Sequence, residues 1–178
     1  WLEIPEPFAL EKIGGVSLLL LPWLDLGTGN QTNLGKGLAL LHQVSAAKNQ
    51  GHFGWEIDGF IGSGPQPGGW RHNWGECFVV LRLLPQLKIA SKWGINAFDY
   101  EKLLVLLITF LNKHEPIPSL VHGDLWSGNT AIHKNGKGVI FDPASWWADR
   151  EVDLAMTRMF GGFSNDFYIG YKTILPIE

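Results

Sequence analysis

The sequence has only one cysteine, Cys77, among its 178 residues. A single thiol cannot form a disulfide within the chain, and no spacing of cysteines and histidines resembles a zinc site. Proteins without disulfides are typical of reducing compartments. The scarcity of cysteine therefore excludes a small disulfide-stapled fold and predicts a cytoplasmic protein.

An excess of positive charge is also lacking. Lysine and arginine number 14 against 17 aspartates and glutamates, so the formal net charge is −3 at pH 7. Proteins that bind nucleic acid or anionic membranes through charge carry a basic patch or a positive excess. The balance predicts that neither nucleic acid nor a membrane is a partner.

Long hydrophobic runs are absent as well. The most apolar stretches, Val16–Leu21 and Leu103–Leu111, have six and nine residues, whereas a membrane-spanning helix needs ~20. Hydrophobic residues still make up 46% of the sequence and charged residues 17%, which predicts a packed globular domain. Because the chain begins and ends abruptly in apolar sequence, we expect it to be part of a longer protein.

Local patterns predict a mixed α+β chain that begins with strands. Two apolar runs, Phe8–Ile13 and Val16–Leu21, flank Gly14 and Gly15, which is typical of a β-hairpin. The leucine spacing in Leu34–Val44 then predicts a helix.

The middle of the chain is rich in glycine and then in leucine. The Gly- and Pro-rich segment Gly51–Asn73 predicts a long functional or mobile loop. Tyr100–Lys113 is apolar on nearly every side, so we expect a central helix there, capped by Asp99. A last helix is expected to open near Asp149.

The segment VHGDLWSGN, residues 121–129, carries the residue types that phosphoryl transfer from ATP requires. That reaction needs a carboxylate near the attacking hydroxyl and oxygen ligands for Mg²⁺ on the phosphates. Asp124 and Asn129 lie five positions apart in one loop. Asp142 lies 18 positions after Asp124 and directly follows a short apolar run. Kinases show this spacing in H-R-D-x-x-x-x-N and the following D-F-G. Each residue alone is a common turn former, but together they predict a kinase site.

Two longer runs extend this motif into a family pattern. SLVHGDLWSGN at residues 119–129 and FDPASWWADREVDLAMTRMFGGF at residues 141–163 resemble the fructosamine (ketosamine) kinase family. Leu34–His42 and Phe53–Leu87 resemble further segments of it. The resemblance implies a protein-kinase-like fold, related to aminoglycoside phosphotransferases and choline kinases. It also implies ATP- and Mg²⁺-dependent phosphorylation of a sugar hydroxyl on ketosamines.

The resemblance implies roles for five polar residues. Asp124 would accept the proton of the hydroxyl, and Asn129 and Asp142 would bind Mg²⁺. His122 and Asp153 would be structural, with Asp153 bracing the catalytic loop. A simple alternative for Asp153 is a first-turn carboxylate that the helix dipole favours.

The same fold implies two lobes joined by a hinge. Residues 1–24 are expected to be the end of the N-terminal lobe and the hinge, and residues 25–178 the C-terminal lobe with the catalytic loop and substrate cleft. The phosphate-covering loop and the strand lysine would lie upstream, outside this chain. Backbone groups of the hinge would hold adenine, so its expected ligands are Leu21, Pro22, Trp23 and Leu24.

Tryptophans near the expected cleft are candidates for stacking on a sugar or an amine. Trp126 lies inside the catalytic loop. Trp146 and Trp147 are adjacent in an extended segment and must point to opposite sides. We expect Trp146 to face the cleft and Trp147 to pack in the core.

The expected substrates are ketosamine small molecules or glycated lysines of proteins, in a deglycation repair activity of a monomer or weak dimer. Asp153 lies only eleven positions after Asp142 and no A-P-E follows, so the peptide-docking segment of protein kinases has no room. Two alternatives stay open: another kinase of the aminoglycoside or choline type, and a catalytically inactive binding module of kinase fold. The complete set of motif residues argues against the second.

Overall fold

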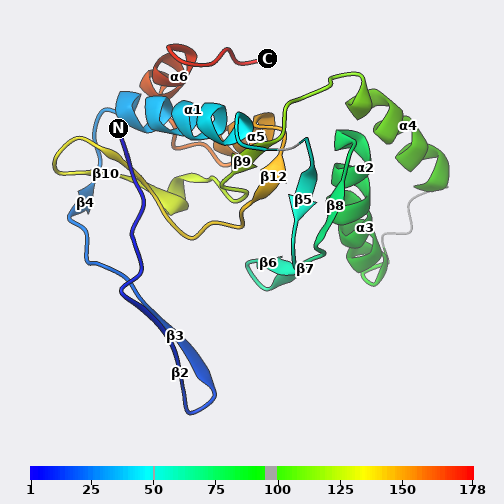
Figure 1. Ribbon diagram of the computed structural model, residues 1–178, viewed down its shortest axis with the longest axis horizontal. Helices are drawn as coiled ribbons and strands as arrows, with labels where there is room; N and C mark the ends of the chain where they lie inside the picture. The colour runs from blue at the N-terminus through cyan, green and yellow to red at the C-terminus, as the bar shows by residue number, and fades with distance from the viewer. Residues whose placement is uncertain (50, 95–99) are drawn as a thin grey trace. The chain divides into compact units, whose positions relative to one another are not determined.

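The computed structural model (Figure 1) describes residues 1–49, 51–94 and 100–178. These residues form two compact units. The first unit comprises residues 1–41, 125–143 and 154–178. The second comprises residues 42–124 and 144–153. The expected helix cap Asp99 lies outside the described residues.

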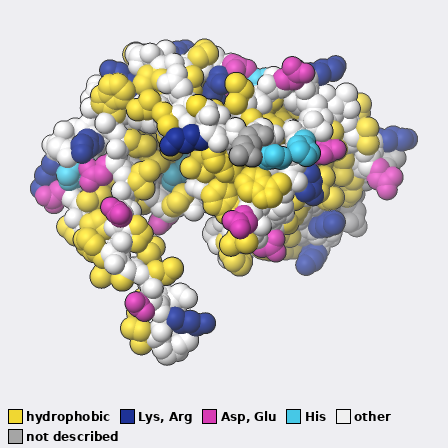
Figure 2. All heavy atoms as spheres, viewed as in Figure 1, with side chains coloured by type: hydrophobic (Ala, Val, Ile, Leu, Met, Phe, Trp, Pro, Cys, Tyr) yellow, Lys and Arg dark blue, Asp and Glu magenta, His cyan; other side chains and the backbone are white. Residues whose placement is uncertain are grey.

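The first unit contains the expected β-hairpin, which is confirmed. β2 (Ala9–Ile13) pairs antiparallel with β3 (Val16–Leu20), and the turn residues Gly14 and Gly15 have φ values of 59° and 84°. Such values at both turn positions match the twist of antiparallel strands. Every residue of β3 is exposed, and Figure 2 shows hydrophobic side chains along the hairpin. An exposed apolar surface of this kind is typical of one that packs against a further element.

A four-stranded sheet follows in the first unit, with strand order β1-β11-β10-β4. Its strands are β1 (Leu2–Glu3), β11 (Gly138–Ile140), β10 (Thr130–His133) and β4 (Leu26–Gly27). β10 and β11 are antiparallel neighbours, with Thr130 opposite Ile140. Because β10 and β11 are antiparallel neighbours, the residues just before β10 lie beside the residues just after β11.

Helices supply the rest of the core of the first unit. They are α1 (Thr32–Ala46), α5 (Glu151–Met159) and α6 (Asn165–Lys172), of which α1 and α5 continue into the second unit. A Cβ on Gly35 would lie 2.0 Å from the carbonyl oxygen of Phe167, so α1 and α6 touch backbone to backbone. The buried core is formed by Leu34, Leu38, Ala39, Leu125, Ile132, Ile140, Leu154, Phe167 and Tyr171.

The second unit is built on a sheet with strand order β8-β5-β12-β9. Its strands are β8 (Gly69–Arg71), β5 (Phe53–Trp55), β12 (Trp146–Ala148) and β9 (Ser119–Val121), and β6 (Gly59–Ile61) pairs with β7 (Gly64–Gln66) in a small hairpin. The helices are α2 (Trp74–Phe78), a π-helical turn η1 (Val79–Leu83), α3 (Leu84–Ser91) and α4 (Tyr100–Asn112). Its core is formed by Phe53, Trp74, Cys77, Leu81, Val121, Trp146 and Ala148.

Two sequence-based expectations for the second unit are wrong. The segment Gly51–Asn73 is not one long loop, because it contains the four short strands β5 to β8. α4 is not central, because none of its residues is buried and Leu106 and Phe110 are 67% and 70% exposed. Among the described helices, α4 packs mainly against α2 and to a smaller extent against η1. No helix in the described ranges is both long and apolar enough to cross a bilayer.

Candidate phosphotransfer site

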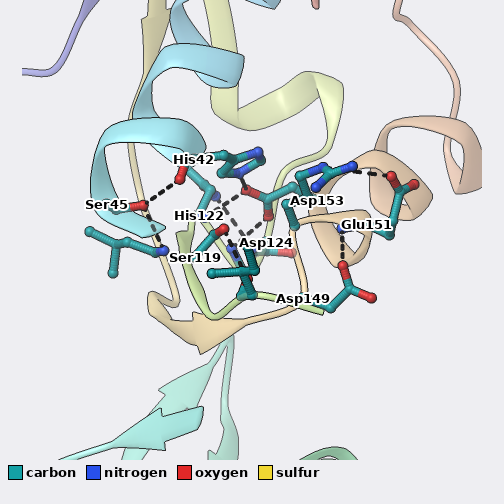
Figure 3. Close-up of polar contacts among 12 residues, drawn as sticks. His42, Ser45, Ser119, His122, Asp124, Asp149, Glu151 and Asp153 are labelled. Carbon is teal, nitrogen blue, oxygen red and sulfur yellow. Dashed lines mark hydrogen bonds and ion pairs between the residues drawn. The ribbon is translucent and has the colours of Figure 1, made fainter. Parts of the chain in front are cut away.

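The loop that follows β9 is held by one buried carboxylate, that of Asp153. Its Oδ2 accepts from the backbone N–H of His122 at 2.8 Å, and its Oδ1 accepts from that of Gly123 at 2.9 Å. The Nε2 atom of His42 lies 3.1 Å from Oδ2, and both side chains are fully buried (Figure 3). Backbone donors this deeply buried need an acceptor. The carboxylate therefore fixes the loop to the start of α5.

His122 and Gly123 give this loop its path. The His122 side chain is buried, its Nδ1 accepts from the backbone N–H of Asp124 at 3.3 Å, and its carbonyl accepts from the N–H of Ala144 at 2.9 Å. Gly123 has φ of 82°, and a Cβ there would lie 2.1 Å from the carbonyl oxygen of Ala144. Only glycine fits this position, so the backbone turns sharply just before Asp124.

Asp124 is the residue that this arrangement presents. It is partly exposed, and it is the last residue of the segment 42–124 of the second unit. A carboxylate on a backbone that is fixed by hydrogen bonds can accept a proton at a constant position. This geometry is compatible with the proton-acceptor role that the sequence predicts for Asp124.

Asn129 and Asp142 lie together in the first unit. Asn129 ends a short 3₁₀ turn, η2 (Ser127–Asn129), and its Nδ2 donates to the Asp142 carbonyl at 3.5 Å. The N–H of Phe141 donates to the Asn129 carbonyl at 3.1 Å. Asp142 is exposed and has φ of 52°. Left-handed backbone is uncommon outside glycine and clusters at functional sites.

The chemistry of this pair fits Mg²⁺. Mg²⁺ is bound by one or two protein oxygens together with phosphate oxygens and water, rather than by a full cage of side chains. Asn129 offers an amide oxygen and Asp142 a carboxylate. Among the described residues, no group of three or more His, Cys, Asp or Glu side chains could hold a metal by itself. Such a pair is suited to a metal that arrives on a nucleotide.

The predicted hinge lines a cavity of about 430 Å³ in the first unit. Its walls include Leu21, Pro22, Trp23 and Leu24, and Asp142 lies in the same cavity. The structure therefore brings the predicted adenine segment and a predicted metal ligand to one hollow. Four lining residues that sequence reasoning missed are Pro5, Asp25, Leu26 and Phe141. The position of Phe141, directly before Asp142, was the available signal.

The expected orientation of Trp146 is wrong. Trp146 is 3% exposed and belongs to the core of the second unit. It pairs with Val121 across β12 and β9, so both side chains point to the core face of the sheet. Trp147 takes the opposite face, where it is half-buried and lines a hollow with Trp70 and His52. The two tryptophans do point to opposite sides, but in the reverse order.

Trp126 is 41% exposed and lies over the loop itself. A Cβ on Gly128 would lie 2.2 Å from its ring, and the Phe160 ring is 6.3 Å away, edge-on. Part of the indole thus remains open for contact with a ligand. His42 was the other residue missed. Its signal was the helical spacing Leu34, Leu38, His42, which places it on the buried face of α1.

Solved structures define the class of fold. The chain aligns with the crystal structure of a Haemophilus somnus protein assigned as a fructosamine-3-kinase, with a TM-score of 0.87 and 29% identity over 99% of this chain and 60% of that one. A Thermobifida fusca protein of the same assignment aligns with a TM-score of 0.76 and 28% identity, over 89% of this chain and 56% of that one. The α+β, protein-kinase-like fold predicted from the sequence is confirmed.

The family follows from the sequence comparison. The fructosamine kinase family model matches residues 1–178, and the chain belongs to this family. A protein named as a probable ketoamine kinase in Synechocystis is 43% identical over 99% of this chain and 60% of its own length. Another of that name in Vibrio parahaemolyticus is 36% identical over 98% and 60%. The chain spans about 60% of the length of these relatives.

Proposed function

We propose that this protein is a kinase that transfers the γ-phosphoryl group of ATP to a sugar hydroxyl of ketosamines. The observation that supports it most is that the motif offers a candidate proton acceptor and a separate pair of candidate metal ligands. A partly exposed Asp124 stands on a loop braced by Asp153, while Asn129 and Asp142 form an oxygen pair beside the hinge cavity. Membership of the fructosamine kinase family supports the substrate class.

The proposed mechanism assigns one task to each group of residues. Asp124 accepts the proton of the attacking hydroxyl as the hydroxyl oxygen bonds to the γ-phosphorus and the bond from that phosphorus to the ADP oxygen breaks, which releases ADP. Asn129 and Asp142 hold Mg²⁺, which would neutralise charge on the phosphates. Backbone groups of residues 21–24 orient the adenine, with the Pro22 carbonyl as an acceptor and the Leu24 N–H as a donor. Asp153 and His122 fix the loop, so that Asp124 need not reorganise during the reaction.

Two lobes would complete this site. We propose that residues 1–24 form the end of the N-terminal lobe and the hinge, and that residues 25–178 form the C-terminal lobe. The exposed apolar strands β2 and β3 would pack against the remainder of the N-terminal lobe, which would supply the phosphate-covering loop and the lysine.

The substrates proposed are free ketosamines and glycated lysines of proteins, and the biological role proposed is repair of glycation in the cytoplasm. Between Asp142 and Asp153 the chain forms β12 and the start of α5, which leaves no docking segment for a peptide. A small molecule or a single protruding side chain is therefore the acceptor that this site suits.

An ADP-release assay on the intact protein that carries residues 1–178 tests the proposal. The acceptors are fructosyl-lysine, ribulosyl-lysine, choline and an aminoglycoside, each with and without Mg²⁺. We expect turnover only with the first two, and only with Mg²⁺. Turnover confined to choline or the aminoglycoside would assign the protein to another small-molecule kinase. MgATP binding without turnover of any acceptor would favour an inactive binding module.

A further inference from the structure

Arg82 is a charged residue in an apolar setting. It lies on the π-helical turn η1, next to the core of the second unit, and burial lowers the pKa of its guanidinium from the ordinary value. Its Nη1 donates to the carbonyls of Pro67 at 3.0 Å and Leu81 at 2.9 Å. Within the described part of the chain it forms no ion pair with a carboxylate, and its Nε atom has no hydrogen-bond partner.

The guanidinium also lies over the indole of Trp146. The guanidinium carbon lies 4.1 Å from the centre of the ring, which is the geometry of a close cation–π interaction. The Trp74 ring packs against the same indole, with 5.6 Å between the centres of the two rings. Arg82 and Trp74 together therefore restrict the position of the Trp146 ring.

The same indole touches the catalytic loop. Its Cδ1 lies 3.2 Å from the point where a Cβ on Gly123 would be, so the ring packs against the Gly123 backbone. Asp153 holds Gly123 by the hydrogen bond to its N–H. Two independent contacts thus position Gly123, and Asp124 is the next residue.

Packing alone does not account for an arginine at this position. A leucine or methionine would fill the same space without the cost of desolvating a charge, and such replacements of buried charges are often neutral or stabilising. A planar guanidinium stacked on a ring and anchored at one end by two carbonyls fixes the ring in one orientation. A π-helical turn is also a feature found frequently at functional sites.

We propose that Arg82 is a positioning residue for Asp124, acting through Trp146 and Gly123. The proposal rests on the proposed function only for its catalytic readout. Displacement of a catalytic group by about 1 Å can cost about 10²-fold in rate. Loss of the guanidinium should therefore lower kcat more than it affects nucleotide binding.

The test compares Arg82→Met with Arg82→Lys and with a matched control, Arg158→Met. Arg158 is also stacked on an aromatic ring, that of Tyr168 at 5.4 Å, but it is exposed and lies in the first unit. We expect Arg82→Met to lower kcat about 10–100-fold and to leave the KM for MgATP within about twofold. Arg82→Lys should fall in between, and Arg158→Met should match the wild type. Equal kcat values in all variants would overturn the proposal, as would a loss that appears equally in the KM for MgATP.

Hydrogen exchange provides a readout that does not depend on the substrate. In Arg82→Met, and more weakly in Arg82→Lys, the amides of residues 121–125 should exchange faster than in the wild type, while those of residues 34–41 keep their rates. Unchanged exchange at residues 121–125 in both variants would overturn the proposal. If the wild type turns over no ketosamine, the proposed function fails, and this exchange comparison still decides the role of Arg82.

A double-mutant cycle tests the route through Trp146. Trp146→Phe and Arg82→Met should each lower kcat, and the double variant should lose little more than the worse single variant, because both act on one contact. Multiplicative losses would show that Arg82 and Trp146 act separately, which would contradict the proposed route.

Discussion

The three polar residues of the motif occupy different environments. Asn129 is buried, Asp124 is partly exposed and Asp142 is exposed with left-handed backbone. Their spacing in the sequence predicted that they act together but not these environments, and the structure shows that the β10–β11 pairing brings Asp142 back beside Asn129. The conformation of Asp142 was not predictable, because aspartate adopts φ > 0 only where the surrounding structure imposes it.

A second residue, Cys77, should make the free energy of unfolding depend on pH in the alkaline range. Burial raises the pKa of its thiol from 9.0 to about 12. Above pH 9 the thiol of the unfolded chain loses its proton while the folded one keeps it, so ionisation favours unfolding. The stabilisation is therefore complete below pH 9 and is lost as the pH rises towards 12, by at most about 1.4 kcal/mol per pH unit.

Urea unfolding of the wild type and Cys77→Ala at about pH 8 and about pH 10.5 measures this effect. The free energy of unfolding should fall more steeply with pH in the wild type, because the variant lacks the thiol. Other groups that titrate in this range are common to both proteins. Equal slopes would contradict the burial of Cys77.

At the scale of elements, the loop after β9 depends on the start of α5. Removal of the carboxylate in Asp153→Ala leaves the buried N–H groups of His122 and Gly123 without their acceptor. Each such group costs about 1–3 kcal/mol, so we expect a large fall in the free energy of unfolding. Urea unfolding with Asp25→Ala as a control measures it, since Asp25 forms an exposed pair with Lys134, worth at most about 1 kcal/mol. Similar losses in both variants would mean that Asp153 does not brace the loop.

The register of β12 makes a second prediction at this scale. Trp146 faces the core and Trp147 faces the open side of the sheet, so Trp146→Ala should lower the free energy of unfolding by about 3–5 kcal/mol. Trp147→Ala should cost about 1 kcal/mol. Thermal and urea unfolding of both variants check the order. A larger loss in Trp147→Ala would require the register to shift by one residue.

The elements also show where sequence patterns are insufficient. The β2–β3 hairpin and the helix from Leu34 were predictable because their signals are local: two adjacent glycines and a leucine repeat. β5 and β8 were missed because each has only three residues, rich in glycine, and β5 is paired with β12, far away in sequence. The position of α4 was missed because an apolar helix sequence does not specify which faces find a partner.

For the whole molecule, the family and the kinase-like fold were predictable because one long motif run contains the catalytic loop and a second follows it. Residue composition alone indicated only a packed globular domain, and local patterns indicated only a mixed α+β chain. The orientation of Trp146 was not predictable, since alternation along a strand states that neighbours point to opposite sides but not which side is buried. That choice depends on the strand pairing, which places Trp146 opposite Val121.

The central claim is that Asp124 serves the chemical step and Asp142 the binding of metal and nucleotide. Titration of MgATP onto Asp124→Asn and Asp142→Asn, with kcat measured on the same samples, tests it most directly. Asp124→Asn should bind MgATP within about twofold of the wild type, while its turnover falls by about 10²–10⁴. Asp142→Asn should bind MgATP more weakly, because it removes a formal charge from the metal site. Loss of MgATP binding in Asp124→Asn together with normal binding in Asp142→Asn would contradict the account.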